Sequence, residues 1–275
     1  MANITAAAVN ELRQKTGVGM MDCKKALVEC DGDMEKAIDY LREKGQKVAS
    51  KRADRDASEG CVLALTNQDK TFGAIIMINC ETDFVGKNED FVNFTRKVLE
   101  NAINAKAKNA GEVNQLVIDG STVENLIVDQ VAKIGEKIQI SHYEALEAPV
   151  VYAYIHPGNR LASLHAMNKT GFDERGHDVA MQIAAMAPLA LDKSQVSADV
   201  IEREMDVYRV QIREEGKPDN MIEKIAEGKL NKFFKESTLL SQEFIKDSKK
   251  NVLQYLQEGD KDLTVTAFYR LMLGA

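Results

Sequence analysis

The chain has 275 residues, of which 44% are apolar, and it carries a formal net charge of -7. This length is enough for two or three compact units, and the negative charge excludes a general nucleic-acid binder, which normally presents a basic face. No apolar run approaches the roughly 18–20 residues that span a bilayer, and the N-terminus lacks a basic stretch followed by an apolar one. We therefore expect a cytoplasmic protein that contacts neither a membrane nor nucleic acid directly.

Neither the cysteines nor the histidines have the spacing of a metal or redox site. The cysteines form no CxxC pair and the histidines no HExxH arrangement, and no Gly-rich phosphate loop is present. We therefore expect no bound metal and no cofactor. The residues concerned are Cys23, Cys30, Cys61, Cys80, His142, His156, His165 and His177.

Residues 1–45 have the pattern of three short helices. Thr5 is a suitable N-cap for the first helix, and Gly17 lies where that helix should end. A second helix is expected from Met20 to Cys30, and a third is expected to stop at Gly45. Three helices of this size make a small core, so this unit is expected to be marginally stable alone.

Residues 46–60 are rich in charged side chains and predict a solvated linker, whereas residues 61–146 predict a unit of strands and helices. A four-residue loop at 67–70 joins the first two strands. A capping box at Ser121–Glu124 is expected to begin the last helix of this unit. The expected strands are 61–66, 71–79 and 138–146, and a further helix is expected to begin at Glu89.

The same pattern recurs in residues 147–275. Two charged helices within 198–235 flank the breaker Gly216–Pro218, so we expect them to pair as an antiparallel hairpin. Strands interrupted by helices predict an α+β fold with two sandwich subdomains. The other expected elements are strands at 150–155, 161–167 and 263–272, and helices at 175–186 and 249–257.

The stretch Met77–Asn88 predicts a corner between a buried strand and a helix. Thr82 and Asp83 can hydrogen-bond their own backbone, which would stiffen this corner and hold Phe84 in one direction. Phe84 has two interpretations, a core residue folded under the corner or a side chain presented to solvent. Spacing alone favours the core, because most large apolar side chains are buried.

Two motifs carry a resemblance to a known family. Asn79–Val85 reads NCETDFV, and Leu12–Leu27 reads LRQKTGVGMMDCKKAL. These segments resemble the two signatures of the bacterial translation elongation factor Ts family, the nucleotide exchange factors for the GTPase elongation factor Tu. The chain departs from the second signature at Met77 and Gly86, where the family usually has Glu and Ser or Ala.

The resemblance implies a fold, a partner and a site. The fold would comprise an N-terminal three-helix domain similar to ubiquitin-associated domains, then two related α/β subdomains with antiparallel sheets, the second carrying a helical hairpin. Asp83 and Phe84 would enter the GTPase near its magnesium and phosphates, so the protein would promote GDP release without catalytic residues and would not be an enzyme. The residues implied to contact elongation factor Tu are Thr82, Asp83, Phe84, Val85, Arg13, Met20, Met21, Lys24 and His156.

Other interpretations are open at this point. The three-helix unit is also compatible with a non-exchanging adaptor or scaffold protein. An enzyme that uses Asp83 or Asp22 with a nearby cysteine lacks the usual histidine partner. Homodimerisation through the helical hairpin is a further expectation.

Overall fold

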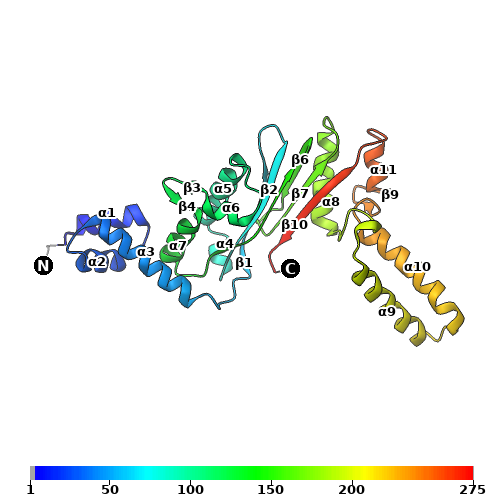
Figure 1. Ribbon diagram of the computed structural model, residues 1–275, viewed down its shortest axis with the longest axis horizontal. Helices are drawn as coiled ribbons and strands as arrows, with labels where there is room; N and C mark the ends of the chain where they lie inside the picture. The colour runs from blue at the N-terminus through cyan, green and yellow to red at the C-terminus, as the bar shows by residue number, and fades with distance from the viewer. Residues whose placement is uncertain (1–3, 275) are drawn as a thin grey trace.

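The computed structural model describes residues 4–274, and residues 1–3 and 275, at the outer ends of the first and last predicted domains, lie outside this part. The molecule is elongated, with a three-helix module at one end, two sheets in the middle and a helical hairpin at the other end (Figure 1). Helices and antiparallel sheets occur together, which confirms the predicted α+β class.

The N-terminal module consists of α1 (Ala6–Thr16), α2 (Met20–Glu29) and α3 (Met34–Lys51). The hydroxyl of Thr5 accepts a hydrogen bond from the backbone N–H of Ala8, and Gly17 ends α1 with φ 68°, as predicted. Leu12, Cys23 and Leu27 are fully buried in a core of this module's own.

The prediction that the third helix stops at Gly45 is wrong, because α3 continues to Lys51. Gly45 instead allows a close approach to α7 (Val123–Ile134), where a Cβ at residue 45 would lie 2.8 Å from the Cβ of Ala132. One turn earlier, the guanidinium of Arg42 donates to Asp129 at 3.3 Å. The last turns of α3 therefore fasten the module to the middle of the molecule.

Two three-stranded antiparallel sheets form that middle part, and the predicted strands are confirmed with small shifts at their ends. In the first sheet the order is β1-β2-β5, and in the second it is β10-β7-β6. Their bounds are β1 Glu59–Thr66, β2 Phe72–Cys80, β5 Gln139–Glu147, β6 Val150–Ile155, β7 Leu161–Met167 and β10 Val265–Met272.

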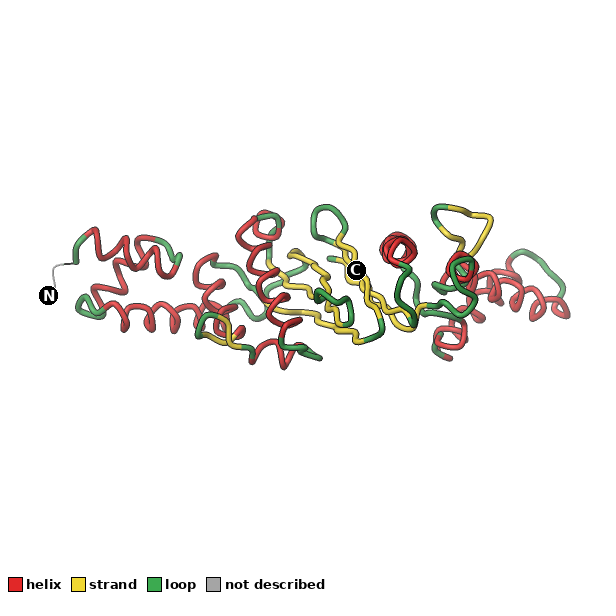
Figure 2. Tube along the Cα trace, turned by 90° about the horizontal axis from the view of Figure 1, so that it is seen from above, coloured by secondary structure: helices red, strands yellow, loops and turns green. Residues whose placement is uncertain are grey.

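The two sheets pack face to face and helices cover their outer faces, so the strands lie between layers of helices (Figure 2). Val62, Ile75 and Leu164 are among the buried residues between the sheets. On the outside, α5 (Glu89–Asn104) and α7 pack on the first sheet, and α8 (Asp173–Met186) packs on the second. All nine residues of β2 are buried, since this strand is covered on both faces.

Two helix starts differ from prediction. Thr122, not Ser121, caps α7, because its hydroxyl accepts from the N–H of Asn125. The last helix, α11, begins at Val252 because Asn251 and Gln254 form the capping box, and residues 249–251 belong to a strand. The remaining elements are α4 Asp83–Gly86, α6 Ala110–Gln115, β3 Val117–Ile118, β4 Ser121–Thr122, η1 Lys193–Gln195, α9 Ala198–Glu214, α10 Asp219–Ser237, β8 Glu243–Phe244 and β9 Asp247–Asn251.

The hairpin predicted within 198–235 is formed by α9 and α10. A small buried cluster between the two helices consists of Ile212, Ile222 and Ala226. The guanidinium of Arg209, on α9, donates to Glu223, on α10, at 2.8 Å. None of the helices within residues 4–274 is both long and apolar enough to cross a membrane.

Candidate functional site

A short helix, α4, begins at Asp83, shortly after the end of β2, and contains the last three residues of the motif Asn79–Val85. Thr82 is its N-cap, with its hydroxyl accepting from the N–H of Val85 at 3.5 Å. Val85 packs against the core of the first sheet, whereas the side chain of Phe84 is 83% exposed. The core interpretation of Phe84 is therefore wrong, and a large aromatic ring stands in solvent at this corner.

Two glycines bring α4 close to the start of β1. A Cβ at Gly86 would lie 2.6 Å from the carbonyl oxygen of Gly60, and Gly60 itself has φ 150°. The backbones therefore touch without intervening side chains. Just before α4, the thiol of Cys80 donates to the carbonyl oxygen of Thr82 at 3.1 Å. The corner thus sits directly on the end of the sheet.

Glu136, in the loop between α7 and β5, holds the base of α4. One oxygen of its carboxylate accepts from the backbone N–H groups of Glu81 and Thr82, both at 3.0 Å. The other oxygen accepts the hydroxyl of Thr82 at 2.7 Å. A carboxylate that accepts three hydrogen bonds is a strong anchor, because bonds to a charged acceptor are about twice as strong as neutral ones.

Glu81 returns the interaction. Its carboxylate accepts from the N–H of Lys137 at 2.7 Å and from the guanidinium of Arg52 at 2.6 Å, and these two bonds, in that order, lower the pKa of Glu81. Lys137 also donates through Nζ to the carbonyl oxygens of Ala53 and Arg55. The end of α3, the base of α4 and the loop after α7 are thereby tied together.

The charge next to Phe84 is that of Asp83. Nζ of Lys87, one turn later, donates to the carboxylate of Asp83 at 2.5 Å, and this bond lowers the pKa of Asp83. Arg160 forms an ion pair with Glu59, which raises the pKa of Arg160, and Asp83 contributes to the same effect. Lys87 therefore contacts Asp83 directly, whereas Arg160, paired with Glu59, interacts with its charge only from a distance.

The structure places His156 on the exposed turn between β6 and β7. Its Nδ1 lies 3.1 Å from the hydroxyl of Tyr154, and the carbonyl oxygen of Asn159 in the same turn accepts from the N–H of Val62 at 2.7 Å. Since Arg160 reaches Glu59 next to Gly60, this turn and α4 flank the same end of β1.

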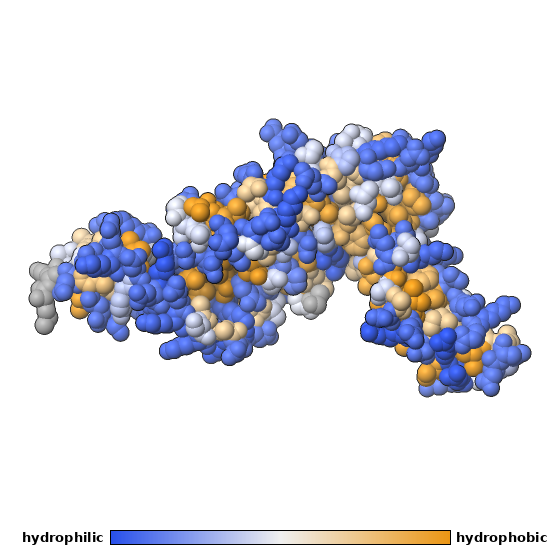
Figure 3. Space-filling model, viewed as in Figure 1, coloured by the Kyte–Doolittle hydropathy of each residue, from blue (hydrophilic) through white to orange (hydrophobic). Residues whose placement is uncertain are grey.

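The last turns of α7 line a hollow of about 290 Å³ together with Phe84. Gln130, Lys133 and Ile134 form its far side. Apolar surface is visible over this region of α4 and α7 and again along the hairpin (Figure 3). Sequence reasoning did not associate α7 or Glu136 with the site, because nothing in the local pattern of either segment indicates which side chain it meets across the fold.

The first motif lies apart from α4, at the N-terminal end of the molecule (Figure 1). Met20 and Met21 are 53% and 77% exposed, so both methionines face solvent. Lys24 and Val28 continue from Met21 along the same face of α2, at helical spacing, and both are exposed. Arg13, on α1, is exposed as well. Val28 extends this face beyond the residues named from the sequence.

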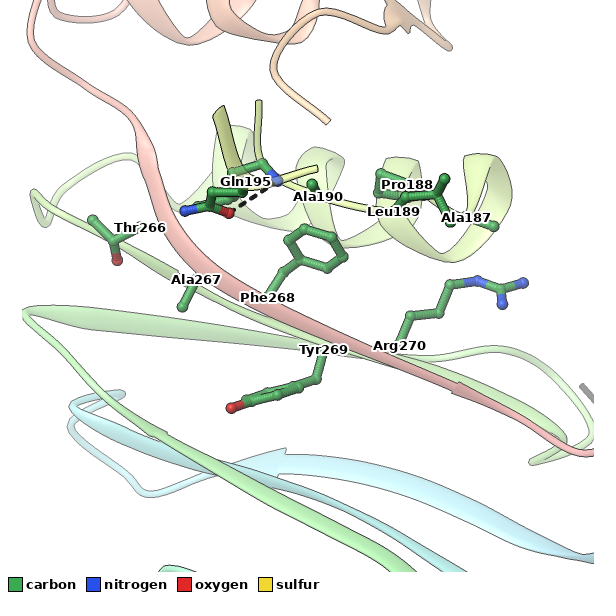
Figure 4. A pocket seen from close by; sticks show the side chains of 11 residues that line it. Ala187, Pro188, Leu189, Ala190, Gln195, Thr266, Ala267, Phe268, Tyr269 and Arg270 are labelled. Atoms are coloured by element: carbon green, nitrogen blue, oxygen red, sulfur yellow. Dashed lines mark hydrogen bonds between the residues drawn. The ribbon is translucent and has the colours of Figure 1, made fainter. Parts of the chain in front are cut away.

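A larger hollow, of about 580 Å³, runs beside the edge strand β10, on the far side of the second sheet (Figure 4). Phe268 points towards the loop at Ala190, whereas Tyr269 points to the opposite side of the strand. Arg270 donates through Nε to the carbonyl oxygen of Ala184 at 3.1 Å. The described lining of this hollow contains no carboxylate, histidine or cysteine.

The comparisons with known proteins agree with the two motifs. The family model for elongation factor TS matches residues 81–275. An elongation factor Ts from Christiangramia forsetii is 50% identical over 276 residues, covering 100% of both chains, and one from Flavobacterium psychrophilum is 48% identical with the same coverage. A third, from Amoebophilus asiaticus, is 50% identical and covers 99% of each chain. The chain therefore belongs to the elongation factor Ts family.

Proposed function

We propose that this protein is a guanine nucleotide exchange factor for elongation factor Tu, and that α4 is the part that reaches the nucleotide site. The observation that carries the proposal is Phe84, which is 83% exposed in a helix whose N-terminal end is anchored by three hydrogen bonds to Glu136. A large aromatic ring held out on a fixed support is suited to insertion into a partner, because aromatic side chains contribute strongly to the energetics of interfaces.

The proposed mechanism needs no covalent chemistry. A GTPase holds GDP through a phosphate-binding loop and a magnesium ion, and slow release of GDP is the step to be accelerated. Phe84 would enter between two helices of the partner while Asp83 displaces groups that hold the magnesium ion. Binding changes the affinity for GDP only through contacts that differ between the GDP-bound and nucleotide-free partner, and the coupling is reciprocal.

One inserted side chain does not supply enough free energy. Accelerating release by about 10⁴ requires about 5.5 kcal/mol, whereas burying one phenylalanine gives about 1.5–3 kcal/mol. The rest would come from other contacts near α4 that strengthen as GDP leaves, and His156 is our candidate for one of them. The exposed face of α2 with Met20, Met21 and Lys24, together with Arg13 on α1, would hold the two proteins together before and during release and so set the affinity.

The test is the release of a fluorescent GDP from elongation factor Tu of the same source, with wild type and Phe84→Ala. Because Phe84 is exposed, the substitution should leave folding intact, and exchange should fall at least tenfold while binding persists. Val117→Ala, which truncates an exposed apolar residue of β3, is the matched control and should exchange normally. Tight binding by wild type without any effect on release would refute the proposal and favour the adaptor interpretation.

We also propose that the hairpin supports self-association, because Val207, Val210 and Met221 are exposed along it. Sedimentation of the full chain over a range of concentrations tests this. Replacement of the three residues by serine should shift the protein towards the monomer, and an unchanged distribution would exclude the hairpin as the contact.

A further inference from the structure

The helix that presents Phe84 cannot hold its own orientation. It comprises the four residues Asp83–Gly86, and a single helical turn is unstable alone because fixing its backbone costs more than its few hydrogen bonds return. Its N-cap bond, from the N–H of Val85 to the hydroxyl of Thr82, is long at 3.5 Å. The direction of Phe84 therefore depends on contacts from outside the helix.

Those contacts converge on one carboxylate. Glu136 accepts from two consecutive backbone N–H groups, those of Glu81 and Thr82, and from the hydroxyl of Thr82. By accepting a hydrogen bond from the hydroxyl, it leaves the lone pairs of the hydroxyl oxygen free to accept from the N–H of Val85, so the same residue fixes the chain entering α4 and the cap that starts it.

We propose that Glu136 is a positioning residue for nucleotide exchange: its carboxylate fixes the direction in which α4 presents Asp83 and Phe84. This inference rests on the proposed function. Glu136 follows Gly135, which ends α7 with φ 80°, and the next residue, Lys137, adds one more bond to the same segment by donating its N–H to the carboxylate of Glu81. Glu136 is partly buried, and its carboxylate is engaged by the segment that enters α4, so we expect it to act on a partner through α4.

The inference predicts a specific kinetic signature. If loss of the carboxylate leaves α4 in its productive direction about one tenth of the time, exchange falls about tenfold. The face of α2 is untouched, so the concentration of protein giving half-maximal exchange should change little. In a chain that already lacks the ring of Phe84, the direction of α4 no longer matters and removal of Glu136 should have little further effect.

The experiment measures release of fluorescent GDP from elongation factor Tu with full-length Glu136→Ala, Phe84→Ala and the double variant. We expect Glu136→Ala to lower the maximal rate about tenfold, and the double variant to match Phe84→Ala within twofold. Glu136→Gln should recover most of the rate, because its amide oxygen still accepts from both backbone N–H groups. Glu124→Ala, which removes an exposed carboxylate from the first turn of α7, is the matched control and should behave as wild type.

The outcomes separate the inference from the function beneath it. A normal rate for Phe84→Ala would refute the proposed function itself. An impaired Phe84→Ala with a normal Glu136→Ala would overturn only the role of Glu136, as would multiplicative effects in the double variant. If Glu136→Ala does not fold, exchange is measured with Glu136→Gln and with Thr82→Val instead. Loss of exchange in the folded Thr82→Val chain supports the positioning role of Glu136, and normal exchange by both variants contradicts it.

Discussion

Truncation of Met21 should separate docking from exchange. Met21 is 77% exposed on α2, in the N-terminal module, which lies apart from α4 (Figure 1). Full burial of a methionine side chain stabilises by about 1.5–3 kcal/mol, so covering this exposed fraction would contribute about 1–2 kcal/mol. At about 1.4 kcal/mol per tenfold, Met21→Ala should raise the half-saturating concentration in the exchange assay by about 5–30-fold.

The maximal rate should stay within about twofold of wild type, because a contact present equally before and during GDP release changes affinity alone. The assay titrates the variant against elongation factor Tu loaded with fluorescent GDP and fits both parameters. Met186→Ala, at a half-exposed methionine on α8, is the control. A wild-type half-saturating concentration would refute docking through α2, and a reduced maximal rate with unchanged half-saturation would place Met21 in the exchange step instead.

Three further predictions concern stability and reactivity. Burial lowers the pKa of His165 to about 3, so on acidification the histidine is protonated in the unfolded chain before it is protonated in the folded one. The free energy of unfolding should therefore fall as the pH drops from about 6.5 towards 3, by up to about 1.4 kcal/mol per pH unit. Urea unfolding at pH 7 and pH 5 should show a smaller loss in His165→Leu than in wild type. A Cβ at Gly176 would lie 2.3 Å from a tyrosine ring, so Gly176→Ala should destabilise by about 1–3 kcal/mol, whereas Gly228→Ala, with no atom within 4 Å, should stabilise by about 0.4–1 kcal/mol; the reverse order in urea unfolding would contradict the packing. Burial raises the pKa values of the Cys61 and Cys80 thiols to about 11 and about 12, so both should resist alkylation at pH 8 until the chain unfolds, and rapid labelling of either in the native protein, located by mass spectrometry, would show that it is accessible.

The longer helices and the sandwich strands followed from local pattern, because hydrophobic periodicity and turn residues record which face is buried, whereas the short helices α4 and α6 were not predicted. The glycines show the limit of prediction from local pattern. Gly17 ends a helix, as predicted, with φ 68°, and Gly135 ends another with φ 80°. Gly45 is also a glycine but does not end a helix, because its role is to allow a close approach to Ala132, a residue 87 positions further along the chain. Only the packed structure distinguishes the two uses.

The candidate site shows the same limit. The motif around Phe84 identified the corner, but its direction depended on two contacts from distant segments, the backbone of Gly60 against Gly86 and the carboxylate of Glu136. Neither Gly60 nor Glu136 stands out from its neighbours in the sequence. The residues that would touch a partner could therefore be named from the motif, whereas the residues that aim them could not.

The burial of β2 on both faces has a consequence for how much order α4 must gain when it binds. Backbone amides in the middle of such a strand exchange with solvent deuterons only in globally opened molecules, so β2 is expected to be among the slowest-exchanging segments. Since α4 begins three residues after β2 ends, at Asp83, one end of this segment is attached to a strand that is expected to open rarely. Under the proposed mechanism, little conformational entropy would then be lost on association, and more of the contact free energy would be available to weaken the hold on the nucleotide.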